Sequence, residues 1–196
     1  MILPAFTQGI YGRLRQQAGA DWQHYVAHPF LRQLANGTLP EPAFRRYLTQ
    51  DYLFLIHFAR SYALLVSKLR TLAEMRAAAA SMNAILDELP LHVGYCREWG
   101  LDEATMAAET EAAETVNYTR YVLDIGHSGD ALDLLAALMP CVAGYAEIGL
   151  GLLETLWQQR GGEARFAELS AIFTTATRLE ANFWQMGLNA VAERPA

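Results

Sequence analysis

A cysteine and a tyrosine stand one helical turn apart in the most apolar stretch of the sequence, residues 132–153. Cys141 and Tyr145 are four residues apart, so a helix places the thiol and the phenol on one face. A thiolate is a strong nucleophile, which makes Cys141 a candidate for covalent catalysis. Pro140 directly precedes Cys141 and either begins a helix or kinks a longer one, and a kink opens a gap where a ligand can bind. The alternative is that Cys141 is a small buried hydrophobic residue without any chemistry.

A carboxylate lies on the apolar face of a second predicted helix. Asp51 shares this face with the aromatic residues Phe54 and Phe58. A buried carboxylate must be paired, hydrogen-bonded or protonated, because an isolated one is costly to bury. The periodicity favours an Asp51 that faces inward, and the alternatives are an outward orientation or an ion pair with Arg46 or Arg60.

A second carboxylate borders aromatic residues near the end of the sequence. Glu180 lies one helical turn before Phe183 and Trp184. It is either a surface acid or a carboxylate in a dry pocket, where its pKa would be raised toward a value useful for proton transfer. Tyr118 and Tyr121 share one face of another segment and offer phenols to the same interior.

The elements that must position these side chains are helices. Apolar residues recur at spacings of three and four, and no segment alternates like a strand. The predicted helical segments are residues 6–14, 22–34, 42–69, 75–95, 106–125, 132–157 and 166–191. Short breaks rich in Gly and Pro separate them, so consecutive helices should be antiparallel. The sequence therefore predicts an all-α bundle that forms a single domain over residues 1–196.

The composition limits the classes of partner. With 15 basic and 21 acidic residues the net charge is −6, which argues against a nucleic-acid partner. The two cysteines, Cys96 and Cys141, do not form a disulfide framework and are expected to be reduced. No signal peptide is recognisable, and Asp133, Pro140 and Glu147 interrupt the only stretch long enough to suggest a membrane span. We expect a cytoplasmic protein that binds a small molecule and neither nucleic acid nor a membrane.

Several short motifs, in this order, resemble the thiaminase II (TenA) family. The resemblance runs from about Phe6 to about Met186, and its most specific parts are the Gln-Asp pair and the element around Cys141. The motifs are Trp22 with His28-Pro29-Phe30, Gly37 with Pro40, Tyr47 to Asp51, Asn117-Tyr118-Thr119, Pro140-Cys141 with Tyr145 and Glu147, and Glu180 with Phe183-Trp184. The resemblance implies a haem-oxygenase-like helical bundle without haem, metal or another cofactor, assembled as a homotetramer.

The same resemblance implies a hydrolase of thiamin salvage. Members of the family convert 4-amino-5-aminomethyl-2-methylpyrimidine to the hydroxymethylpyrimidine and ammonia, and many also cleave thiamin. By resemblance Cys141 is the nucleophile, Asp51 binds the aminopyrimidine and stabilises charge, and Glu180 transfers protons. Phe54 is the aromatic residue that stacks on the pyrimidine, and Tyr118 and Tyr145 orient the ring and the thiol.

One departure from the family pattern concerns the region before the last helix. Family members usually have a further helical segment with a Trp-Ile-x-x-Tyr element after the position of Gln159. Here the chain passes directly through Arg160-Gly161-Gly162 into the last helix, so the domain is shortened around Gln159–Gly162. The family tyrosine of that segment has no counterpart, which implies an altered pocket wall and a changed substrate or a lower activity.

Two other functions compete with the hydrolase. Glu88 and His92 stand four residues apart, and with Asp51 or His57 they have the composition of a di-metal oxidase site, although Pro90 lies between them. No repeated Glu-x-x-His pair supports that site, and structural histidines are the alternative. The second competitor is a helical protein that binds or senses an aminopyrimidine without turning it over, an idea that the shortened region supports.

Overall fold

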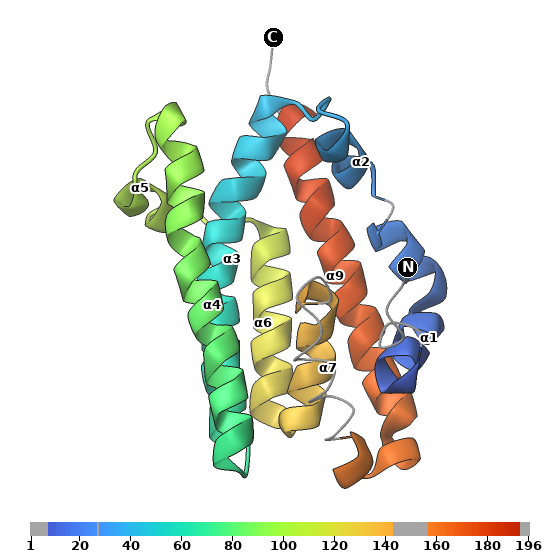
Figure 1. The fold of residues 1–196 in the computed structure, drawn as a ribbon. Helices are drawn as coiled ribbons and strands as arrows, with labels where there is room; N and C mark the ends of the chain where they lie inside the picture. The colour runs from blue at the N-terminus through green and yellow to red at the C-terminus, as the bar shows by residue number, and fades with distance from the viewer. Residues whose placement is uncertain (1–7, 27, 143–156, 193–196) are drawn as a thin grey trace.

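The computed structural model describes residues 8–26, 28–142 and 157–192, and its regular elements are all helical (Figure 1). The α-helices are α1 (Gly9–Val26), α2 (Pro29–Ala35), α3 (Glu41–Lys68), α4 (Leu72–Cys96), α5 (Glu103–Ala107), α6 (Ala113–Ser128), α7 (Ala131–Val142) and α9 (Phe166–Ala192). Two 3₁₀ turns, η2 (Arg97–Trp99) and η4 (Gly162–Arg165), follow α4 and precede α9. The described part of the chain contains no β-strand, so the predicted all-α class is confirmed.

The helices form a bundle in which α6 and α7 lie between α3 and α9 (Figure 1). Helix α4 packs along the outer side of α3, and α1 packs along α9 on the opposite flank. Four helices therefore surround one interior: α3, α6, α7 and α9. Within the described residues no helix is long and apolar enough to cross a membrane.

Helix α7 is the central element of the core. Every residue from 131 to 140 is buried, including Leu132, Leu135 and Leu138. Each fully buried leucine contributes roughly 1.5–3 kcal/mol relative to an exposed one. A helix that is apolar on all sides must be surrounded by other helices, which explains why this stretch has almost no polar face.

The start of α7 is fixed by ionic and hydrogen-bonding contacts. The carboxylate of Asp130 accepts a hydrogen bond from the Leu132 amide at 2.7 Å, and Asp133 accepts one from the Asp130 amide at 2.8 Å. Arg165 from η4 binds both carboxylates. This pairing allows Asp133 to be buried, because its charge is neutralised by a guanidinium with several donors.

Two predicted helices are each divided in the structure. The segment 22–34 breaks at His28, because Pro29 cannot continue α1 and instead occupies the first turn of α2. His28 then caps α2, its Nδ1 accepting a hydrogen bond from the Phe30 amide at 3.2 Å. The segment 106–125 likewise breaks between α5 and α6. Pro140 does not begin a helix but lies in the last turn of α7.

The contact of α6 with its neighbours can be tested at Gly126. A Cβ atom there would lie 2.7 Å from Leu64 Cδ2 and 3.1 Å from Leu134 Cδ1, so Gly126→Val should lower the free energy of unfolding by about 1–3 kcal/mol through overpacking. Gly94 in α4 is a matched control, because a Cβ there meets nothing within 4 Å. Gly94→Ala should raise stability by about 0.5–1 kcal/mol. Denaturant unfolding of both variants measures these changes, and equal effects at the two glycines would contradict the packing.

Candidate active site

Cys141 lies in the last turn of α7 beside a cavity of about 260 Å³. The rest of the described wall comes from Val142 and from facing residues of α3 and α4, and it is mostly apolar. Cys141 is one of the residues that line this cavity, and it also packs against the hydrophobic core. Glu88 of α4 is the acidic residue of that wall. A nucleophile in the wall of a small apolar cavity suits a compact, largely apolar ligand.

A buried carboxyl group lies next to the thiol. Glu180 of α9 is 5% exposed, and its Oε1 accepts a hydrogen bond from the Tyr118 hydroxyl at 2.6 Å. Burial raises the pKa of Glu180 to about 7, although the hydrogen bonds from Tyr118 and Cys141 act in the opposite direction. Burial also raises the pKa of the Cys141 thiol well above its usual value, and the negative charge of Glu180 adds to that rise. The thiol is therefore neutral at rest, with a proton acceptor in contact with it.

The second carboxylate has different partners. Oδ2 of Asp51 lies 2.7 Å from Nε2 of His92 in α4 and 3.4 Å from the hydroxyl of Tyr47, one turn earlier in α3. Asp51 faces the interior, and its partner is this histidine rather than an arginine, since Arg60 contacts His57. The charge of Asp51 acts on both Cys141 and Glu180, raising the pKa of each. The structure thus brings together the three residues that the sequence singled out.

Aromatic residues enclose this cluster. Phe54 packs between Tyr118 and Phe183, with ring centroids 5.0 Å and 5.4 Å away. Trp184 stacks on Tyr25, the two ring planes inclined by 7°. These rings exclude water around Glu180, which is the physical origin of its raised pKa.

Several residues of the site were missed or misread in the sequence. Tyr25 donates from its hydroxyl to the carbonyl oxygen of Pro140 at 3.2 Å, which ties α1 to the residue before the thiol. Tyr121 does not join Tyr118, because its hydroxyl donates to the backbone of Ile172 at 3.1 Å. The spacing of Tyr47 and Asp51, four residues apart on α3, was the signal that could have identified Tyr47.

Gln50, next to Asp51, fixes α3 to the start of α6. Its Oε1 accepts hydrogen bonds from the Ala112 amide and the Thr115 hydroxyl, both at 2.8 Å, and its Nε2 donates to the Thr110 carbonyl at 3.0 Å. The side chain of Gln50 is fully buried. Because Tyr118 follows Thr115 by three residues, this contact sets the position of the Tyr118 hydroxyl over the site.

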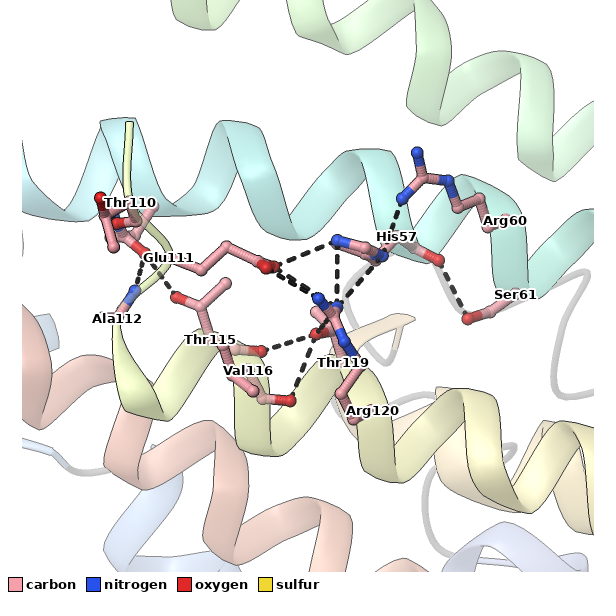
Figure 2. A network of polar contacts seen from close by, with 11 residues as sticks. His57, Arg60, Ser61, Thr110, Glu111, Ala112, Thr115, Val116, Thr119 and Arg120 are labelled. Atoms are coloured by element: carbon pink, nitrogen blue, oxygen red, sulfur yellow. Dashed lines mark hydrogen bonds and ion pairs between the residues drawn. The ribbon is translucent and has the colours of Figure 1, made fainter. Parts of the chain in front are cut away.

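A second polar network between α3 and α6 reinforces the same junction (Figure 2). Figure 2 shows His57 of α3 in contact with both Glu111 and Arg120, with a His57 Nε2 to Glu111 Oε1 distance of 3.1 Å. Arg120 donates to Glu111 at 2.7 Å and to the Thr119 hydroxyl at 2.9 Å. Burial and the charge of Arg120 lower the pKa of His57, so this ring serves as a neutral structural contact.

Two further expectations from the sequence concern Tyr145 and a metal site. Tyr145, which was expected to orient the thiol, lies outside the described residues, as does Glu147. Among the residues that the structure describes, no group of three or more His, Cys, Asp or Glu side chains is arranged to hold a metal ion. Nε2 of His92 lies 2.7 Å from Oδ2 of Asp51.

Comparison with known proteins agrees with these observations. The TENA/THI-4/PQQC family profile matches residues 15–151 of the chain. The chain belongs to this family. An uncharacterized protein of Haemophilus influenzae is 39% identical to this TenA-family chain over 210 residues, with 90% of this chain and 98% of the relative covered. The aminopyrimidine aminohydrolase of Halalkalibacterium halodurans is 31% identical over 210 residues, with 90% and 94% covered.

Solved structures confirm the fold of the TenA-family chain. A crystal structure from Silicibacter, described as a TenA family transcription regulator, gives a TM-score of 0.86 at 40% identity and covers 91% of this chain and 96% of that one. A domain from Shewanella denitrificans with a heme oxygenase-like fold gives a TM-score of 0.64 at 13% identity over 92% of each chain. That second likeness shows the fold alone, and it agrees with the predicted haem-oxygenase-like bundle.

The role of Gln50 can be measured as stability. Gln50→Leu leaves the Ala112 amide, the Thr110 carbonyl and the Thr115 hydroxyl without this partner, and should lower the free energy of unfolding by about 3–5 kcal/mol. Gln23→Leu, at an exposed position of α1, is the control and should change stability by no more than about 0.5 kcal/mol. If denaturant unfolding shows that Gln50→Leu lowers the free energy of unfolding by less than about 1 kcal/mol, Gln50 does not fix α3 to the start of α6.

Proposed function

We propose that this protein hydrolyses the C–N bond of 4-amino-5-aminomethyl-2-methylpyrimidine, releasing ammonia and the hydroxymethylpyrimidine for thiamin salvage. The observation that carries the proposal is the contact of the Cys141 thiol with the Glu180 carboxyl, whose pKa burial raises to about 7. A group with that pKa exchanges protons efficiently near neutral pH. Relatives named aminopyrimidine aminohydrolase, from Halalkalibacterium halodurans and Helicobacter pylori, support the same substrate class.

In the first half of the reaction, the Cys141 sulfur adds to the ring and the amine leaves. The Glu180 carboxylate takes the proton of Cys141 while the sulfur bonds to a pyrimidine carbon, which interrupts the aromaticity of the ring. The electron pair then forms an exocyclic methylene, the C–N bond breaks, and Glu180 gives its proton to the departing amine, which leaves as ammonia. Glu180 is a carboxylate again at the end of this half.

The second half adds water and releases the enzyme. Water adds to the exocyclic methylene and loses a proton to Glu180, and the bond between sulfur and the ring breaks as the ring regains its aromaticity. Cys141 recovers its proton from Glu180, so protons and electrons balance over the cycle. One carboxyl group acts in both directions, and a pKa near 7 suits that double role.

Asp51 is proposed to hold the ring during both halves. A carboxylate can accept a hydrogen bond from the exocyclic amino group and stabilise a proton on the adjacent ring nitrogen, which makes the ring a better electrophile. Glu88 in the cavity wall lies one turn from His92 on α4, and burial and the charge of Asp51 raise the pKa of Glu88, so the Asp51–His92 pair is close to that wall. Phe54 and Tyr118 are proposed to bound the ring, as is Tyr145.

Other parts of the expected function stay predictions. They are the cleavage of thiamin, assembly as a homotetramer, a cytoplasmic location and a single domain shortened around Gln159–Gly162. A non-catalytic role is the second candidate, because a structure 40% identical to this chain is described as a transcription regulator. Such a protein would bind the aminopyrimidine and release no ammonia.

The test is an assay of ammonia release from the aminomethylpyrimidine by the wild-type protein and by Cys141→Ser. We expect turnover by the wild type and a loss of kcat of about a thousandfold or more in the variant, because serine is a poor nucleophile at its ordinary pKa. Binding of the hydroxymethylpyrimidine should be retained.

Cys96→Ala is the matched control. Cys96 is the other cysteine and is buried in a separate cluster with Met106 and Val93, so its loss should leave kcat unchanged. If the wild type binds the aminomethylpyrimidine tightly but releases no ammonia, the non-catalytic role is supported and the hydrolase is refuted. Equal rates in the wild type and Cys141→Ser would refute the cysteine mechanism.

A further inference from the structure

His92 has acceptors at both of its ring nitrogens. Nε2 lies 2.7 Å from Oδ2 of Asp51, and Nδ1 lies 3.4 Å from the carbonyl oxygen of Glu88, one turn earlier in α4. A carboxylate and a carbonyl can only accept, so the contacts favour a proton on each nitrogen. The two side chains are well shielded from water, with His92 8% and Asp51 15% exposed. Contacts of this kind between groups 41 residues apart fix α4 against α3 at the level of the site.

The two oxygens of Asp51 have different environments. Oδ2 is near both His92 and the hydroxyl of Tyr47, at 2.7 Å and 3.4 Å. Within the described ranges, Oδ1 has no hydrogen-bonding partner. A carboxylate held through one oxygen presents the other at a fixed place, and Asp51 lies in the same electrostatic cluster as Cys141 and Glu180.

We propose that His92 is the positioning residue of Asp51: its Nε2–H holds Oδ2 so that Oδ1 meets the amino group and ring nitrogen of the aminopyrimidine. This inference rests on the function proposed above and adds a residue that acts through Asp51 rather than on the substrate. It also gives His92 a role other than metal binding.

The physical reason is the cost of an unpaired buried carboxylate. Without a donor at Oδ2, the Asp51 side chain would rotate toward another partner, and Oδ1 would leave the place where it meets the amino group. Tyr47 remains, but 3.4 Å is long for a hydroxyl donor. Burial lowers the pKa of His92, whereas the hydrogen bond and the charge of Asp51 raise it, and the net effect is a raised pKa that favours the charged ring.

Two amide variants test whether binding needs an N–H at the position of His92 Nε2 or only a polar side chain at residue 92. His92→Gln places an amide N–H where Nε2 lies, whereas the amide of His92→Asn is one methylene shorter and ends near the position of Nδ1. We expect His92→Asn to weaken hydroxymethylpyrimidine binding at least tenfold in calorimetry and His92→Gln to stay within about threefold of the wild type. In turnover, His92→Asn should raise KM by a similar factor and also lower kcat, because Asp51 acts in binding and in the reaction.

The controls cover folding and specificity. Thermal unfolding verifies that each variant is folded, and His92→Leu, which has no donor, replaces His92→Asn if that variant does not fold. His127→Leu, at an exposed histidine near the end of α6, should bind like the wild type.

The outcomes distinguish this inference from the proposed function. If folded His92→Asn binds and turns over like the wild type, or if His92→Gln loses as much as His92→Asn, the positioning role of Nε2 is wrong while the hydrolase stands. If the wild type binds the pyrimidine but releases no ammonia, the hydrolase is wrong and the binding comparison still decides the role of His92. If the wild type does not bind the pyrimidine, both proposals fail.

Discussion

The burial of one carboxyl group organises the site. Glu180 lies among aromatic rings and is held by the Tyr118 hydroxyl at 2.6 Å. A charge in such surroundings is costly, so its pKa rises to about 7, and the neighbouring Cys141 thiol is kept neutral for the same reason. The proposed reaction needs both effects. A carboxyl group with an ordinary pKa would be a weak base for a thiol, and near neutral pH it would seldom carry the proton that the departing amine needs.

The fold provides this environment by converging four helices. Cys141 comes from α7, Glu180 from α9, Asp51 from α3 and Tyr118 from α6, and no two of them share a helix. Their relative positions depend on contacts that have no chemical role. These are the hydrogen bonds of Gln50 to the start of α6 and the His57 network between α3 and α6 (Figure 2). The packing of the helices therefore sets the position of Glu180 relative to the Cys141 thiol.

The sequence predicted the helices better than the side-chain partners that they bring together. Periodicity is a property of one segment, so it indicated the inward face of Asp51 and the apolar helix that carries Cys141, but it left Glu180 undecided between the surface and a dry pocket. It could not show that His92 meets Asp51, because that pairing depends on the register between α3 and α4. The helix break at Pro29 was also not predicted, because the apolar residues on both sides of it keep the helical spacing. The roles expected of the site residues stay predictions.

The central claim is that Glu180 is a buried acid with a pKa near neutrality. Carbon-13 NMR of the resting protein with labelled glutamate, assigned by comparison with Glu180→Gln, measures its titration directly. The account predicts a midpoint at about pH 7, with the carboxyl protonated below it and ionised above it. A midpoint near the ordinary glutamate value of about 4.3 would contradict the account, because Glu180 would then be too weak a base to serve the Cys141 thiol.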